Sequence, residues 1–260
     1  MVEGAIISSC PDLGLRDIGR PDLGHRDMGR PDLGLRDIGR PDLGRRSTLG
    51  GLLGAALLPA ALLPRPVQAG IPTNRRLTFD VSRNDKPIGA HLVTFEPAAD
   101  GMDVTVAVDF VVRWAGLVFY RYSLRGSETW RGDVLMAAHG ETNDDGTRHA
   151  MRATRRNGRL VVEGTNGPTY TAPAQSIVSS HWNPAQLAAP MINIQDGELL
   201  AFQIDPKGRG TITARGRQVE ADHFALTGKA SLELWYDRQN VWSKLLAVSW
   251  DGSQIEYRQT

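Results

Sequence analysis

Hydrophobic and polar residues alternate with a period of two along most of the chain from residue 77 onward. In the clearest stretch, Val104, Val106, Val108, Phe110 and Val112 fall on one face, and mostly polar or small residues lie between them. A side-chain period of two is typical of β-strands that bury one face. The pattern therefore predicts strands, with little helix, over this whole region.

Tight-turn dipeptides separate the expected strands at short intervals. They favour hairpins with very short loops, and they are Gly132-Asp133, Asp145-Gly146, Asn157-Gly158, Asn166-Gly167 and Asp251-Gly252. This spacing predicts an antiparallel meander rather than alternating strands and helices. The fold class expected is all-β: a single antiparallel β-meander.

A flat meander of many strands would leave two exposed edges. We expect the sheet to hide them by curling into an open or closed barrel. The stretch from Pro184 to Ile192 lacks strand periodicity and is expected to hold one helical turn. We interpret it as part of a loop that crosses the sheet and covers one mouth of the barrel.

An export signal of the twin-arginine kind precedes the β-region. Arg45 and Arg46 stand before an apolar run of 15 residues, 49–63, and Val67-x-Ala69 fits a signal peptidase site. A bilayer span needs about 20 apolar residues, so a permanent membrane anchor is not expected. The signal predicts a periplasmic or secreted protein that meets the twin-arginine translocase and signal peptidase during export. The general secretory route stays open.

A decapeptide repeat that begins at Pro11 occupies much of residues 1–44. Each copy has too few apolar residues to offset the entropy of ordering its backbone, so the segment is predicted to be disordered. The near-identity of the copies also fits a repeat that is not translated, with a start such as Met28. We therefore expect three parts: the repeat (1–44), the signal peptide (45–69) and a single β-barrel-like domain (70–260).

Charge and cysteine content exclude several classes of function for residues 70–260. That part holds 21 Lys plus Arg and 21 Asp plus Glu, so it has no net formal charge. The balance argues against nucleic acid and against an anionic membrane as the main partner. The only cysteine, Cys10, lies outside it, which excludes disulfides, thiolate ligands and cysteine nucleophiles there. No cofactor is expected.

Several motifs of the predicted domain resemble an uncharacterised family of exported bacterial β-proteins, a domain of unknown function. The motifs are Glu128–Asp133, Thr142–Gly146, His181–Pro184, Leu234–Asp237 and Asp251–Tyr257. The resemblance implies no activity. At the level of the fold it implies a similarity to open β-barrel carriers of the bacterial envelope.

Aromatic side chains beside amide and imidazole groups suit a sugar or an amphipathic ligand, and an amphipathic or lipid-like ligand is the expectation for an exported barrel. The candidate ligand-binding residues are Glu128, Trp130, Asn143, His181, Trp182, Asn183, Trp235, Tyr236 and Asp237. No catalytic residue is predicted, because no nucleophile motif of high specificity occurs. An amphipathic small molecule is therefore the expected partner.

Two alternative functions remain open at this stage. In the first, a cofactor-independent enzyme acts on an envelope saccharide or lipid through Glu128, His181 or Asp237. Glu128 and Asp237 could then work as a carboxylate pair, unless Glu128 simply pairs with Arg121, Arg125 or Arg131 on the surface. In the second, the protein is a structural partner in an envelope complex and docks through a sheet edge.

A metal site is the remaining candidate. His139 and Glu141 share a strand face, and His149 follows across a hairpin turn. Zinc sites need about three protein ligands in tight geometry. A charged hairpin tip is the commoner cause of such spacing, so no metal is predicted.

Overall fold

The computed structural model describes residues 69–249 and 251–260. The predictions for the repeat and for the twin-arginine signal lie outside these residues, apart from Ala69. The described part is nearly all β, as the period of two predicted. The fold class is therefore confirmed.

Eight strands make up the first half of the described chain. They are β1 (Arg76–Arg83), β2 (Lys86–Ala98), β3 (Gly101–Trp114), β4 (Leu117–Arg131), β5 (Val134–Asp144), β6 (Thr147–Arg156), β7 (Arg159–Gly164) and β8 (Tyr170–Thr171). The second half returns through β12 (Phe202–Ala214), β13 (Arg217–Gly228), β14 (Ser231–Asp237), β15 (Trp242–Val248) and β16 (Gln254–Gln259).

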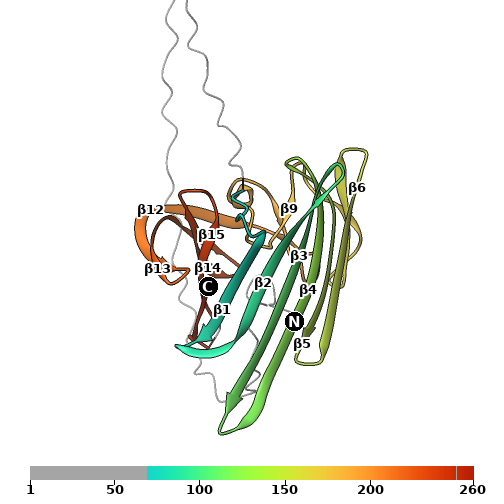
Figure 1. The fold of residues 1–260 in the computed structure, drawn as a ribbon. Coiled ribbons are helices and arrows are strands. Elements are labelled where there is room, and N and C mark those ends of the chain that lie inside the picture. Colours follow the sequence, from blue (N-terminus) through green and yellow to red (C-terminus); the bar gives the residue numbers. More distant parts are fainter. Residues whose placement is uncertain (1–68, 250) are drawn as a thin grey trace, which may run out of the picture. The chain divides into compact units, whose positions relative to one another are not determined.

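The two halves join into one antiparallel sheet because the last strand pairs with the first. The sheet has 13 strands in the order β12-β13-β14-β15-β16-β1-β2-β3-β4-β5-β6-β7-β8. Phe79 of β1 lies opposite Gln259 of β16 at this junction. Strands β12 and β8 are the two edges, so the curled sheet forms an open barrel rather than a closed one (Figure 1).

Short hairpins connect neighbouring strands, several of them through two residues that both have positive φ. Asp145 (φ 47°) and Gly146 (φ 98°) join β5 to β6, and Asn157 (φ 50°) and Gly158 (φ 78°) join β6 to β7. Positive φ at both positions is the signature of a type I′ turn, in which Asn-Gly and Asp-Gly are favoured. The turn dipeptides thus set these connections as predicted.

Alternate residues of the strands form a buried face on one side of the sheet. The stripe from Val104 to Phe110 on β3 is 0–2% exposed at its even-numbered positions. Glu128 and Trp130 of β4 lie on this same face. The apolar period of the sequence therefore identifies the core of the domain.

A segment of 30 residues, 172–201, connects β8 to β12, and we call it the crossing segment. It carries β9 (Ile177–Val178), the 3₁₀ helix η2 (Pro184–Leu187), β10 (Met191–Ile192) and β11 (Leu199–Leu200). The strands form a small sheet of their own, and η2 is the helical turn that the sequence predicted. Figure 1 shows the crossing segment between the β1–β6 and β12–β15 halves of the large sheet.

Glycines on three strands seat the crossing segment directly on the sheet. A Cβ atom on Gly140 would stand 1.8 Å from the carbonyl oxygen of Ile194, and one on Gly164 would stand 1.9 Å from that of Asp196. At Gly126, which pairs with Gly140, the nearest atom is Ile194 Cδ1 at 2.8 Å. The segment thus lies across the middle of the buried face, whereas we expected it to cover a mouth of the barrel.

Candidate functional site

Glu128 lies at the centre of the buried face, where β4 meets the crossing segment. Its side chain is 2% exposed, and Trp130 Nε1 donates to Glu128 Oε2 at 2.7 Å. Trp182 Nε1 reaches the same carboxyl group at 3.2 Å and 3.3 Å, and Ser180 adds a further hydrogen bond. One carboxyl group thus holds two indole rings and the crossing segment together.

The environment of Glu128 shifts its protonation toward neutral pH. Burial raises the pKa of the carboxyl group from 4.5 to about 7, and the hydrogen bonds from Ser180, Trp130 and Trp182 oppose this rise. The two indole rings meet edge to face with centroids 5.4 Å apart, and Phe95 packs on Trp182 at 5.2 Å. The group is therefore a titratable acid inside an aromatic core.

His181 precedes Trp182 and is fixed through its backbone. Its carbonyl oxygen accepts from Tyr236 Oη at 2.7 Å and from Gln186 Nε2 at 3.2 Å. Its φ of 67° lies in the left-handed region, which a residue with a side chain rarely adopts. Strand β14 and η2 thereby hold the imidazole ring against Trp242, with centroids 5.6 Å apart.

A second histidine, His91 of β2, completes this buried polar group. It is 3% exposed and packs on Trp242, with ring centroids 5.2 Å apart. Burial, and to a smaller extent the nearby His181, lower its pKa to about 3. Burial also lowers the pKa of His181 to about 4, against an opposing hydrogen bond from Gln186. Both rings are neutral at physiological pH.

A small cavity separates the two histidines. Its volume is about 10 Å³, and its polar lining comes from His91, Ser179, Ser180, His181, Asn193 and Gln195. Both nitrogens of His91, Nδ1 of His181 and Nδ2 of Asn193 have no hydrogen-bond partner among the described residues. A volume of this size with several polar groups fits one water molecule.

The other candidate residues lie elsewhere and have their own structural roles. Asn143 accepts from the backbone N–H of Gly146 in the β5–β6 turn, and Asn183 caps η2 by accepting from Ala185. Trp235 stacks on His223 with centroids 4.2 Å apart, on the opposite face of its strand from the buried Tyr236. The structure thus brings together Glu128, Trp130, His181, Trp182 and Tyr236, but not Asn143, Asn183, Trp235 or Asp237.

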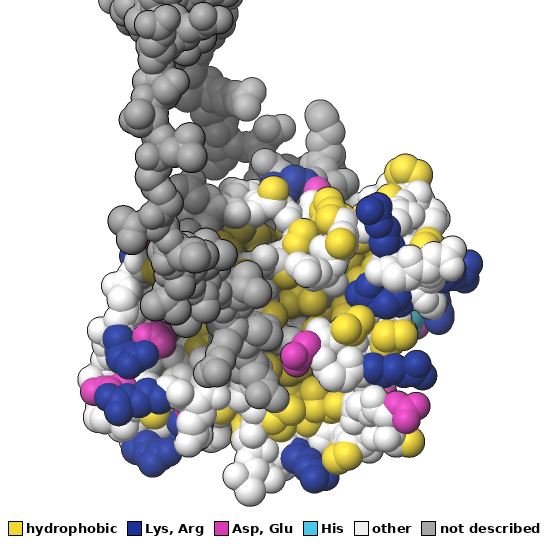
Figure 2. Space-filling model, turned by 90° about the horizontal axis from the view of Figure 1, so that it is seen from above, with side chains coloured by type: hydrophobic (Ala, Val, Ile, Leu, Met, Phe, Trp, Pro, Cys, Tyr) yellow, Lys and Arg dark blue, Asp and Glu magenta, His cyan; other side chains and the backbone are white. Residues whose placement is uncertain are grey.

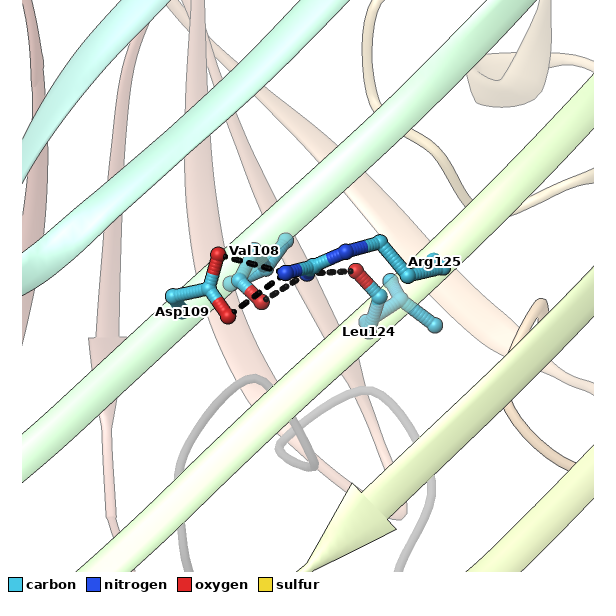
Figure 3. Close-up of polar contacts among 4 residues, drawn as sticks. All are labelled: Val108, Asp109, Leu124 and Arg125. Carbon is cyan, nitrogen blue, oxygen red and sulfur yellow. Dashed lines mark hydrogen bonds and ion pairs between the residues drawn. The ribbon is translucent and has the colours of Figure 1, made fainter.

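The proposed carboxylate pair does not form, because each acid has separate partners. Asp237 binds Arg215 at 2.8 Å and accepts from the backbone N–H of Val241, whereas Glu128 binds the tryptophans. The alternative prediction, that Glu128 pairs with an arginine on the surface, was also wrong. Figure 3 shows that Arg125 donates hydrogen bonds to the two carboxylate oxygens of Asp109, at 2.8 Å and 2.9 Å, and to the carbonyl oxygens of Val108 and Leu124.

The metal candidates form only a loose contact. His139 Nε2 and Glu141 Oε1 are 3.6 Å apart on β5, and His149 of β6 lies opposite Thr142. Among the described residues, no group of three or more His, Cys, Asp or Glu side chains is arranged to hold a metal ion.

Sequence reasoning missed three members of the site. His91 carried a usable signal, because it falls in register with Val93 and Phe95 on the apolar face of β2. A polar residue on such a face marks a buried polar group. Gln186 and Asn193 lie in irregular sequence, where no periodicity indicates which side chains turn inward.

Comparison with known proteins places the domain in a family. Residues 79–260 match the model described as "Domain of unknown function (DUF6134)". The chain belongs to this family. The recognised resemblance to an uncharacterised family of β-proteins is thereby confirmed, while export is not tested by it.

The DUF6134 domain is also similar to a solved structure, "Crystal Structure of Beta-barrel-like Protein of Domain of Unknown Function DUF1849 from Brucella abortus". The TM-score is 0.51 at 8% identity, over 71% of this chain and 94% of the other. At this identity the likeness shows the fold alone. No curated protein matches the chain. In the described part of the DUF6134 protein, no helix is long and apolar enough to cross a membrane.

Proposed function

We propose that this protein is exported to the cell envelope and binds an amphipathic, lipid-like ligand on the buried face of its open barrel. The observation that carries the proposal is the crossing segment, which covers the buried face of the sheet. Several polar atoms on the side that faces the sheet have no protein partner among the described residues. Trp130 and Phe95 supply an apolar surface beneath it, Trp182 of the segment packs against that surface, and Glu128, His91 and His181 supply polar groups at the contact.

The closed position of the crossing segment leaves several buried polar atoms without a protein partner among the described residues. Nδ1 of His181 and Nδ2 of Asn193 are buried without a partner among the described residues, as are both ring nitrogens of His91 beneath them. One water molecule in the cavity between these atoms can bond only some of them. A ligand with a polar head could satisfy these groups, while its apolar part would replace the contacts that the segment makes with the aromatic rings.

The upper end of the domain offers a route for such a ligand. Figure 2 shows hydrophobic side chains gathered in the middle of this end, with Lys and Arg along parts of its rim. Leu187 and Ala189 of the crossing segment are half-buried hydrophobic residues packed against the core. An apolar floor with a charged rim suits a molecule that has an apolar chain and a charged head.

The cavity between the two histidines is too small for a lipid, since its volume of about 10 Å³ fits only one water molecule. Binding therefore requires the crossing segment to move. The apparent affinity is then reduced by the fraction of molecules in which the segment is displaced. A change that weakens the closed position should raise the affinity for the ligand.

Glycine substitutions test this coupling. A Cβ atom on Gly140 would collide with the crossing segment, whereas one on Gly210 of β12 would meet nothing within 4 Å. We expect Gly140→Ala to bind a fluorescent fatty-acid analogue more tightly than the wild type, and Gly210→Ala to bind as the wild type does. Native mass spectrometry of protein isolated from its own envelope should show a co-purified lipid. Absence of that lipid together with no saturable probe binding in either protein would refute the proposal.

One observation favours the structural alternative, a partner in an envelope complex. Strand β12 spans 13 residues, pairs only with β13, and is exposed along most of its length. Such an edge can accept a strand from another protein, although Pro206 and a bulge beside it protect the middle of the edge. A large native assembly in detergent extracts, with no bound lipid, would favour this function.

The enzymatic alternative has less support from the geometry. A pKa of about 7 would suit Glu128 for acid–base work. Both of its oxygens, however, accept from indole N–H groups, and its side chain is almost completely buried. Its carboxyl group therefore binds the crossing segment through Trp182 and is not open to a substrate.

A further inference from the structure

The β3–β4 hairpin projects beyond its neighbours at the end of the sheet opposite the β4–β5 turn. Pairing of β3 with β2 ends at Phe110, and pairing of β4 with β5 begins at Tyr122. The residues between these points, 111–120, pair through their backbones only within the hairpin, whereas the backbone of Arg121 bonds to Asp145 of the β5–β6 turn. Figure 1 shows this green hairpin reaching past the β1–β2 and β5–β6 turns.

The tip of this hairpin is apolar and exposed. Leu117, Val118 and Phe119 are 69%, 40% and 54% exposed, although hydrophobic side chains of this size are usually buried. The sequence from Trp114 to Phe119 holds no charged or amide side chain. Even the turn position that favours Asn or Asp is occupied by Ala115, at a φ of 49°.

Two arginines flank the apolar tip. Arg113 lies opposite Val118, and Arg121 follows Phe119 by two residues on β4. Both are exposed, and neither guanidinium group forms a salt bridge among the described residues, while the backbone N–H of Arg121 donates to the Asp145 carboxylate at 3.2 Å. An apolar tip with unpaired cations beside it complements a surface whose apolar interior lies beneath anionic head groups.

We propose that the β3–β4 tip inserts into the surface of an anionic phospholipid bilayer. At about 3.3 Å per residue, the stretch from Leu117 to Phe119 covers roughly the 5–10 Å over which interfacial elements enter a membrane. Arg121 then lies about 13 Å from Leu117 along the strand, and Arg113 reaches the head groups by extending its apolar stem. This docking is independent of the ligand proposed for the interior of the barrel.

Vesicle flotation with the intact protein tests the insertion. We expect binding to vesicles of phosphatidylcholine with 30% phosphatidylglycerol, and at least about tenfold weaker binding after Leu117→Ser with Phe119→Ser, because two apolar side chains are lost from the bilayer. Val134→Ser is the matched control, since Val134 is also exposed (46%) but begins β5 at the other end of β4. Equal binding by the tip variant and the wild type would overturn the proposal, as would failure of the wild type to float.

The charge requirement has its own test and control. Arg113→Gln with Arg121→Gln should abolish the preference for phosphatidylglycerol vesicles over pure phosphatidylcholine vesicles and weaken the salt dependence of binding. Arg156→Gln with Arg159→Gln changes two exposed arginines at the β6–β7 turn and should leave both unchanged. Equal loss in the two double variants would show that total charge, and not the tip, attracts the lipid. That result would contradict the proposal.

Discussion

The carbonyl oxygen of Ile194 lies 1.8 Å from the point where a Cβ atom on Gly140 would stand. The crossing segment therefore touches the backbone of β5 with no side chain between them. This contact sets how deeply the segment sits, and hence how closely Trp182 approaches Glu128 on the adjacent strand.

Replacement of Gly140 by alanine should destabilise the domain. The added methyl group meets backbone atoms, so the segment has to shift, and overpacking of this kind costs about 1–3 kcal/mol. Urea unfolding followed by circular dichroism measures the loss. Gly210→Ala is the control, because a methyl group there meets open space. Equal stability of the two variants would show that the segment does not press on β5.

Glu128 should make the protein less stable as the pH rises toward 7. Its folded pKa of about 7 lies above 4.5, so the folded state binds more protons than the unfolded state between these values. The contribution of Glu128 to the free energy of unfolding is fully present below pH 4.5. It falls by about 3 kcal/mol in total as the pH rises through 7. Glu128→Gln, which keeps an oxygen for the indoles, should flatten this dependence. Unfolding midpoints in urea from pH 5 to 8 measure this dependence in both proteins. If the wild type and Glu128→Gln lost stability in parallel, Glu128 would not be its cause.

His91 should act in the opposite direction at acid pH. Its folded pKa of about 3 lies below 6.5, so its contribution to stability is present above pH 6.5 and is lost as the pH falls toward 3. His91→Leu removes a buried group that must stay neutral and should shift acid unfolding to lower pH. His139→Leu is the control, since that ring is partly exposed on β5. An unchanged acid midpoint in His91→Leu would exclude His91 as a cause of acid unfolding.

Much of the fold follows from local sequence, and the site follows from it only in part. The period of two identifies the buried stripe from Val104 to Val112, and Asp145-Gly146 and Asn157-Gly158 set type I′ turns that make a meander unavoidable. Pairing of β1 with β16 depends on contacts between residues that are far apart in sequence, such as Phe79 and Gln259. No local pattern identifies that pairing, and none shows that the edge strands β12 and β8 stay apart, so whether the barrel would be open or closed could not be predicted.

The candidate site shows the same limit. Glu128 and Trp130 stand two residues apart on one strand, so their shared face follows from the period of two. Trp182 stands in irregular sequence, and its contact with Glu128 arises only when the crossing segment folds onto the sheet. Asn143 and Asn183 look like ligand-binding amides in the sequence, yet each satisfies a backbone N–H group of its own turn.

The tip of the β3–β4 hairpin allows stability to be separated from lipid binding. Ala115 has a φ of 49°, which costs a residue with a Cβ atom about 1 kcal/mol and costs Asn less. Ala115→Asn should therefore stabilise the domain by about 0.5–1 kcal/mol, and Asn157→Ala, the reverse change in a turn with φ of 50°, should destabilise it by a similar amount. Thermal unfolding measures both. The amide at position 115 also makes the tip polar, so this more stable variant should bind anionic vesicles more weakly. A variant that gained stability and kept its vesicle affinity would show that the apolar tip does not enter the bilayer.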